Sequence, residues 1–179
     1  FGYTYFVIFI ILLMGILWKF KPKTWFFCGT ILASWLLQKL VKFIIGRPRP
    51  DSSFWWMMES SSSFPSGHAI TVACVFVLLC WFVCTSTNVK KWAKWLVCSI
   101  AAALMILVPL SRIILSVHYF SDVIAGLLFG SFVAVFGILF YNIFLDCQNK
   151  KQANADLKSE VKNQHMENIN NKQNIEFKK

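Results

Sequence analysis

Five long apolar runs constrain this chain more than any other feature of its sequence. They cover residues 1–18, 25–45, 68–87, 93–112 and 121–146. Each is close to the roughly 20 residues that a helix needs to cross the hydrocarbon core of a bilayer. Because lipid offers backbone groups no hydrogen-bond partners, each run is most simply a helix. The sequence therefore predicts an all-α, polytopic transmembrane helical bundle that occupies residues 1–147 as one domain.

The composition supports a membrane location and argues against nucleic-acid binding. Hydrophobic residues make up 57% of the chain, and the mean hydropathy of +0.58 is too high for an ordinary soluble domain. A formal net charge of +10 would suggest a nucleic-acid partner in a soluble protein, but the lysines here gather at the ends of apolar runs. That pattern sets the orientation of a membrane protein. We therefore expect the membrane, and no nucleic acid, as a partner.

The lysines also predict which side of the membrane each loop occupies. They lie between the first and second runs, between the third and fourth runs, and after the fifth run. If the runs alternate across the bilayer, these three regions share one side, which the charge rule assigns to the cytoplasm. Five spans then place the N-terminus outside, and the chain begins with Phe1 inside an apolar run. We therefore expect that a first, cytoplasm-to-outside helix is missing.

Two further features carry no chemistry in this interpretation. Residues 148–179 are rich in Lys, Asn, Gln and Glu with few apolar positions, so they cannot bury a core and are expected to form a disordered cytoplasmic tail. The six cysteines lie inside apolar runs or at the end of one, without a CxxC pair. They are expected to be small buried hydrophobic residues rather than metal ligands.

The chemically active residues lie on the opposite side, at the extracytoplasmic ends of the runs. The candidate residues there are cations, imidazoles and one carboxylate: Lys42, Arg47, Arg49, His68, Arg112, His118 and Asp122. The four cations oppose the charge rule, and an anionic ligand is the simplest compensation. One such residue alone would be a snorkelling cation or a hydrogen-bonded structural histidine. Their occurrence together at one membrane depth indicates a site.

This set of residues fits phosphoryl chemistry. A phosphoryl group in transfer carries charge on three oxygens, which fixed cations stabilise without reorganising. Pro65-Ser66-Gly67-His68 precedes an apolar run, so Ser66 can cap the helix and Gly67 lets the backbone approach a ligand. The free amides and the dipole at the start of that helix would receive an anion. Taken alone, however, the Pro-Ser-Gly segment is only a turn signal followed by a helix.

His118 and Asp122 are four residues apart. If that stretch is helical, they share a face and the carboxylate can accept a hydrogen bond from one ring nitrogen. The other nitrogen is then an unprotonated lone pair, which makes the imidazole a nucleophile or a base. The alternative is that Asp122 is an ordinary first-turn helix residue beside a cap at Ser121.

Three signatures contain these residues, and together they resemble those of the type 2 phosphatidic acid phosphatase superfamily, which also includes the vanadium-dependent haloperoxidases. They are Lys42-x6-Arg49-Pro50, Pro65-Ser66-Gly67-His68 and Ser111-Arg112-x5-His118-x3-Asp122. Every signature position is filled, and the resemblance covers roughly residues 25–146. The C-terminal tail takes no part in it.

The resemblance implies a six-helix membrane enzyme, whereas five spans are visible here, with its site at the extracytoplasmic face. His118 would attack phosphorus and form a phosphohistidine, and Asp122 would orient and activate it. His68 would protonate the leaving lipid alkoxide and then activate water. The residues that hold the phosphate oxygens would be Lys42, Arg49, Ser66, Gly67 and Arg112. The scheme needs no metal and no cofactor.

Two neighbouring residues have lesser roles in this scheme. Ser111 belongs to the third signature but is given only a supporting part. Arg47 is an extra cation in the segment 46–50, where it could meet a lipid head group or a second phosphate.

The main hypothesis is therefore an integral-membrane lipid phosphatase that releases inorganic phosphate from a lipid phosphomonoester or pyrophosphate. A bacterial enzyme is expected, with phosphatidylglycerophosphate, phosphatidate or undecaprenyl pyrophosphate as substrate. The alternative is a non-catalytic lipid-phosphate binder or transporter, which would not need two imidazoles and a carboxylate. A haloperoxidase is disfavoured because those relatives are soluble and this chain is largely lipid-facing.

Overall fold

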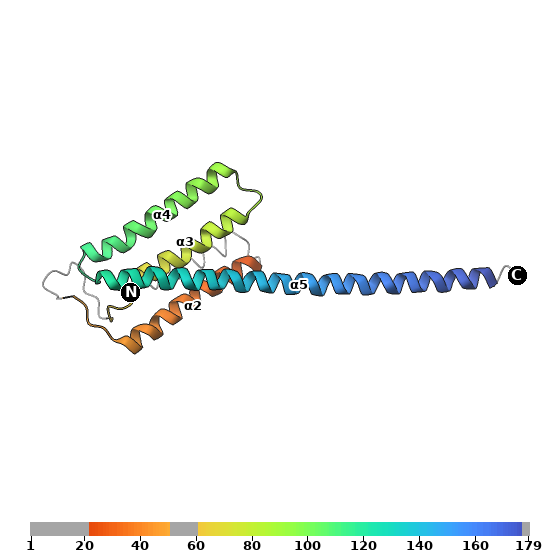
Figure 1. The fold of residues 1–179 in the computed structure, drawn as a ribbon, viewed down its shortest axis with the longest axis horizontal. Coiled ribbons are helices and arrows are strands. Elements are labelled where there is room, and N and C mark those ends of the chain that lie inside the picture. Colours follow the sequence, from red (N-terminus) through yellow and green to blue (C-terminus); the bar gives the residue numbers. More distant parts are fainter. Residues whose placement is uncertain (1–21, 51–60, 177–179) are drawn as a thin grey trace. The chain divides into compact units, whose positions relative to one another are not determined.

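The computed structural model describes residues 22–50 and 61–176, with side chains up to residue 164. The described residues contain helices and no strands, which confirms the predicted all-α fold. The helices are α2 (Pro22–Ile45), α3 (Gly67–Thr85), α4 (Lys91–Ile114) and α5 (Phe120–Glu176), shown in Figure 1. The predicted span at 1–18 lies outside the described residues.

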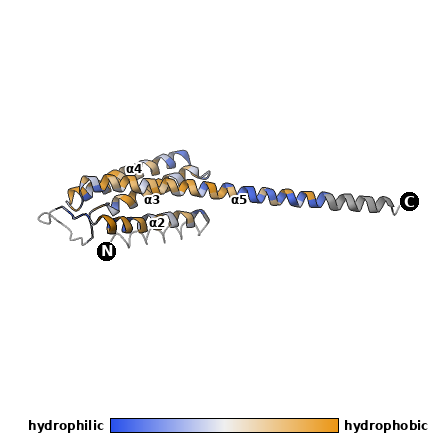
Figure 2. Ribbon diagram, turned by 60° about the horizontal axis from the view of Figure 1, so that its bottom comes forward, coloured by the Kyte–Doolittle hydropathy of each residue, from blue (hydrophilic) through white to orange (hydrophobic). Residues whose placement is uncertain are grey.

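Each of these four helices is long and apolar enough to cross a membrane. The candidate spans are Lys23–Ile45, Gly67–Thr85, Lys91–Ile114 and Phe120–Gln164. Their positions agree with the four predicted runs that fall in the described chain. Large apolar side chains point outward along the helices, for example Phe43 at 87% and Leu128 at 68% exposure. Such surfaces would be unfavourable in water but suit lipid, and Figure 2 shows the apolar colouring of these segments.

The core lies around α3, which packs against both α2 and α4. Its central cluster contains Phe27 and Ile31 from α2, Val75 and Leu78 from α3, and Ala134 from α5. Buried apolar atoms of this kind gain dispersion contacts in a densely packed interior.

Small residues bring the start of α5 close to the start of α3. A Cβ at Gly126 would lie 2.8 Å from the Ser66 carbonyl oxygen, and one at Gly130 would collide with the Ile70 backbone. The small residues of the Gly126-x3-Gly130-x3-Ala134 face therefore allow close helix packing. The close approach places the first turn of α5 beside the first turn of α3.

The segment between α4 and α5 is short and turns sharply. Ser116 has a φ of 54° in the left-handed region, which a non-glycine residue adopts only rarely. The Ser116 amide donates to the Ile113 carbonyl at 2.8 Å, and the Val117 amide donates to the Arg112 carbonyl at 3.3 Å. This turn carries His118 to the start of α5.

The C-terminal region differs from the expectation of a disordered tail. Helix α5 continues to Glu176, and all described side chains from 142 to 164 are exposed. The composition argument about burial was sound, because this region packs into no core. It missed that Lys, Gln, Glu and Ala are good helix formers whose backbone hydrogen bonds need no core. The chain divides after Ile138, and the residues of the site described below lie before that boundary.

Candidate active site

The predicted site residues lie at one end of the bundle. Lys42 is in the last turn of α2, Arg112 is in the last turn of α4, and Asp122 is in the first turn of α5. Gly67 and His68 begin α3, directly after Ser66. These four helix ends come together at one end of the ribbon in Figure 1. The structure thus gathers residues from three separate signatures.

The start of α3 is tied directly to the start of α5. The Ser66 amide donates to the Asp122 carbonyl oxygen at 3.0 Å. Ser66 is fully buried, and its Oγ has no hydrogen-bond partner among the described residues. The expectation that Ser66 caps α3 through its side chain was wrong, because no such hydrogen bond forms. Leaving a buried hydroxyl unsatisfied costs about 1–3 kcal/mol, which a ligand in the site would recover.

A glycine is needed at position 67 because the side chain of Gln38 lies against it, and Gln38 was not among the predicted site residues. A Cβ at Gly67 would collide with the side-chain amide of Gln38, which is 2% exposed and lies one turn before Lys42 on α2. The Gln38 Oε1 has no hydrogen-bond partner within the described chain. A polar amide inside an apolar span was the signal that could have identified it.

Two of the predicted cations hold the loop that leads to α3. Lys42 Nζ donates to the Ser62 carbonyl oxygen at 2.8 Å, and the Ser62 hydroxyl donates to the Lys42 carbonyl oxygen at 3.0 Å. Arg49 Nε donates to the Ser61 carbonyl oxygen at 2.7 Å, and its Nη1 donates to the Val117 carbonyl oxygen at 2.8 Å. These hydrogen bonds position both cations beside the two loops.

The third predicted cation is positioned by its neighbour. Arg112 Nε donates to the Ser111 hydroxyl oxygen at 3.2 Å, and that hydroxyl donates to the Val108 carbonyl oxygen at 2.7 Å. Ser111 therefore supports Arg112, in agreement with the lesser part expected for it.

His118 and Asp122 form a buried pair, but not by the predicted helical geometry. His118 Nδ1 lies 3.6 Å from Asp122 Oδ2, and both side chains are almost fully buried. His118 precedes α5, which begins at Phe120, so the turn rather than a shared helical face brings the ring to the carboxylate. The Tyr119 amide also donates to Asp122 Oδ2 at 3.0 Å. A carboxylate facing one ring nitrogen leaves the other nitrogen able to act as a nucleophile or base.

Arg47 contacts the carboxylate of Asp122. Its Nη1 donates to Asp122 Oδ1 at 2.7 Å and to the Ser121 hydroxyl at 2.8 Å. The Ser63 hydroxyl donates to Asp122 Oδ2 as well. From sequence, Arg47 is expected near a head group or a second phosphate. Ser63 stands in a run of four serines, and no signal in the sequence distinguishes it from its neighbours.

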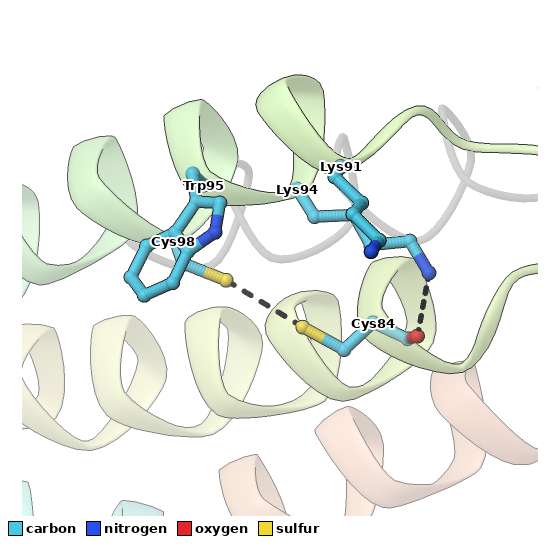
Figure 3. Close-up of a pocket in the computed structure, with 5 residues that line it drawn as sticks. All are labelled: Cys84, Lys91, Lys94, Trp95 and Cys98. Atoms are coloured by element: carbon cyan, nitrogen blue, oxygen red, sulfur yellow. Dashed lines mark hydrogen bonds between the residues drawn. The ribbon is translucent and has the colours of Figure 1, made fainter.

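A small hollow at the other end of α3 and α4 has different chemistry (Figure 3). Its volume is about 240 Å³, and its lining residues are Cys84, Lys91, Lys94, Trp95 and Cys98. The sulfur atoms of Cys84 and Cys98 lie 3.7 Å apart, and Lys94 Nζ donates to the Cys84 carbonyl oxygen at 2.8 Å. Only Cys28 and Cys74 are buried as predicted, whereas Cys84 and Cys147 are exposed. The residues that line this hollow include no imidazole or carboxylate, so it is not a candidate for the phosphoryl site.

Comparison with known proteins identifies relatives of this chain. Residues 23–146 match the model of the PAP2 superfamily. Phosphatidylglycerophosphatase B of Bacillus subtilis (strain 168) is 35% identical over 132 residues, which cover 72% of this chain and 64% of that protein. Lipid A 1-phosphatase of Rhizobium johnstonii is 34% identical over 127 residues, which cover 66% of this chain and 46% of that protein. The chain thus spans less than two thirds of the length of either relative.

A solved structure shares the fold. It is the crystal structure of the first transmembrane PAP2 type phosphatidylglycerolphosphate phosphatase from Bacillus subtilis, with a TM-score of 0.69 and 31% sequence identity. The match covers 76% of this chain and 69% of that chain. Together with the four apolar helices, this likeness shows a multi-pass membrane protein. The family model covers well over half of the sequence, and the protein therefore belongs to the PAP2 superfamily.

Proposed function

We propose that this protein is a membrane lipid phosphatase that releases inorganic phosphate through a phosphohistidine at His118. The observation that carries the proposal is the buried His118–Asp122 pair, with 3.6 Å between Nδ1 and Oδ2. The Ser66 amide, two residues before His68, is bonded to the Asp122 backbone. In this proposal the candidate acid, His68, comes from the start of α3. The nucleophile His118 and its orienting carboxylate, Asp122, come from the region where α5 begins.

The reaction proceeds in two steps in this proposal. His118 Nε2 attacks phosphorus and forms a P–N bond while the P–O bond to the lipid breaks, and His68 donates a proton to the departing alkoxide. His68 then takes a proton from water, whose oxygen attacks the phosphohistidine. The P–N bond breaks, inorganic phosphate leaves and both imidazoles return to their starting states.

The surrounding cations and amides stabilise the charge on the transferring group. Lys42, Arg49 and Arg112 are each positioned by hydrogen bonds to oxygen atoms, and in this proposal their positive charges stabilise the phosphate oxygens. The first amides of α3 form an anion site at a helix start, and the unsatisfied Ser66 hydroxyl is available to the same ligand. Arg49 and Arg112 can give two parallel hydrogen bonds to one phosphoryl group.

The proposed substrate is a lipid phosphomonoester or pyrophosphate. The name of the Bacillus subtilis relative makes phosphatidylglycerophosphate the first candidate. Phosphatidate and undecaprenyl pyrophosphate share the terminal phosphoryl group that this chemistry needs. We propose a reaction that requires no metal, because each proton and charge in the two steps is assigned to a side chain.

We also propose that the site faces the extracytoplasmic side and that the C-terminal region is cytoplasmic. Lys91 and Lys94 stand at the start of α4, whereas the site residue Arg112 stands in its last turn. The two lysines at the end away from the site follow the charge rule for cytoplasmic loops.

The decisive experiment is a substrate panel with a matched loss of one imidazole. Phosphate release is measured in detergent with EDTA, from phosphatidylglycerophosphate, phosphatidate and undecaprenyl pyrophosphate. Wild type is expected to turn over at least one lipid, whereas His118→Ala loses turnover. His165→Gln is the control, because it removes the remaining histidine of the chain, which lies in the C-terminal region. Equal rates for wild type and His118→Ala would reject the mechanism, and binding without release would favour a lipid-phosphate binder.

A further inference from the structure

The carboxylate of Asp122 is held by more groups than the proposed reaction uses. Asp122 is fully buried, and its two oxygens have different partners. Oδ1 accepts a hydrogen bond from Arg47 at 2.7 Å. Oδ2 accepts from the Tyr119 amide at 3.0 Å and from the Ser63 hydroxyl, and it also faces His118. The His118 ring therefore faces a carboxylate whose orientation is fixed by hydrogen bonds to both of its oxygens.

Arg47 is anchored at several points around this carboxylate. Its guanidinium carbon lies 4.2 Å from the centre of the Tyr119 ring, a cation–π distance. Its Nη1 also donates to the Ser121 hydroxyl at 2.8 Å. Its carbonyl oxygen accepts from the Ser63 amide at 2.8 Å. Arg47, Ser63 and Asp122 thus form a closed set of hydrogen bonds across three separate segments, which we name the Asp122 clamp.

We propose that Arg47 and Ser63 are positioning residues that fix Asp122 against His118. The inference rests on the proposed role of His118 as the nucleophile. A carboxylate can rotate about its Cβ–Cγ bond, but Arg47 on Oδ1 and two donors on Oδ2 prevent that rotation. The Arg47 guanidinium also places a positive charge 2.7 Å from Oδ1, which compensates the buried carboxylate electrostatically. His118 then needs only a small movement to close its 3.6 Å contact with Oδ2.

The contacts distinguish Arg47 from the phosphate-binding cations. The hydrogen bonds of Arg49 and Lys42 include donations to carbonyl oxygens of the loops. Arg47 forms an ion pair with the buried carboxylate of Asp122. The negative charge of the carboxylate offsets the positive charge of Arg47. A cation paired in this way is a weak ligand for a second phosphate. It is expected to affect the chemical step through Asp122 and not the affinity for the lipid.

The test separates kcat from KM on the lipid that wild type turns over best. Arg47→Gln is expected to lower kcat by roughly 10²-fold, the size of effect that a misplaced catalytic group produces, with little change in KM. Arg47→Lys restores part of the rate because it returns the positive charge. Ser63→Ala gives a smaller loss of kcat. In an Asp122→Asn background, Arg47→Gln is expected to cause almost no further loss, since residues acting through one group are not additive.

Two control variants and a measurement of thermal stability accompany this test. Lys39→Gln removes a cation from α2 that lies over Trp35 outside the site, and Ser99→Ala removes an exposed hydroxyl from α4. Both are expected to keep wild-type rates. Thermal unfolding in detergent identifies any variant that fails to fold, and Arg47→Lys and Ser63→Ala then carry the test.

Two kinetic outcomes would overturn the clamp. One is a higher KM with unchanged kcat in Arg47→Gln, and the other is full additivity with Asp122→Asn. If wild type releases no phosphate, the proposed function fails, and nitrogen NMR shifts of the His118 ring still test the clamp without turnover. Arg47→Gln is expected to move those shifts and Lys39→Gln to leave them unchanged. Unmoved shifts in Arg47→Gln would reject the inference.

Discussion

Asp122 shows how much of this site depends on where single polar atoms lie. It is a buried carboxylate that receives hydrogen bonds from Arg47, Ser63 and the Tyr119 amide, and its backbone carbonyl accepts from Ser66. An uncompensated buried charge would be strongly destabilising, so these donors are needed for folding as well as for orientation. The same contacts join all three signatures at one point. Residue-level changes should therefore separate chemical roles from structural ones.

Loss of the candidate acid and base should trap the covalent intermediate. His68→Gln is expected to lower turnover of the lipid by roughly 10²–10⁴-fold, the usual contribution of general acid–base catalysis. With an aryl phosphate, whose leaving group needs little protonation, the first step should persist while hydrolysis of the P–N bond slows. Radiolabelled phosphate should then accumulate on His118 in an acid-labile, base-stable form. Absence of the label in His68→Gln, with the same substrate still cleaved, would contradict the assigned roles. The double variant with His118→Ala should carry no label.

At the scale of elements, the contact between α3 and the start of α5 sets the geometry of the site. Gly126 approaches the Ser66 carbonyl, and Gly130 approaches the Ile70 backbone. These contacts allow the first turns of both helices to share a hydrogen bond between the Ser66 amide and the Asp122 carbonyl. The turn after α4 then delivers His118 to the same place. Packing of small residues therefore supports the geometry of the candidate site indirectly.

A pair of glycine substitutions tests this packing. Gly130→Ala adds a methyl group where the Ile70 backbone already lies, so it should destabilise the protein by about 1–3 kcal/mol, as overpacking does. Gly29→Ala is the matched control because a Cβ there meets nothing within 4 Å. It should be neutral or stabilising by up to about 1 kcal/mol, since alanine is the better helix former. Thermal unfolding in the same detergent measures both. Equal stability of the two variants would show that the α3–α5 contact is looser than the structure indicates.

At the scale of the whole molecule, the candidate site residues and the C-terminal region belong to different units of the chain. The site residues end at Asp122, and the chain divides after Ile138. The helix beyond that point is exposed at every described side chain from 142 to 164. The match to the family model ends at residue 146. The C-terminal region therefore makes no contribution that the proposed chemistry requires.

Cleavage between the two parts tests both the independence of the site and its orientation. A recognition sequence for a specific protease is inserted after Cys147, followed by a C-terminal tag. In sealed inside-out vesicles, added protease should remove the tag and leave phosphate release unchanged. In right-side-out vesicles the tag should be protected while externally added lipid is still turned over. Loss of activity on cleavage would assign a role to the C-terminal region, and cleavage in right-side-out vesicles would reverse the proposed orientation.

The sequence by itself determined the class of fold and the inventory of the site. Runs of about 20 apolar residues permit little except membrane-crossing helices, and four of the five predicted runs fall on described helices. The three signatures named the residues that meet at one end of the bundle because their types suit a phosphoryl group. Composition was less reliable beyond residue 147, where local helix propensity acts without any burial.

Tertiary structure alone decided which of those residues contact one another. The Arg47–Asp122 pair joins positions 75 residues apart, and the Ser63–Asp122 hydrogen bond joins positions 59 apart. The pairing of His118 with Asp122 depends on a turn with a left-handed Ser116, whereas spacing suggested a helix. Such contacts arise from the packing of separate helices and from the need to satisfy a buried carboxylate. Neither requirement is visible in local sequence, because it depends on which segments meet in space.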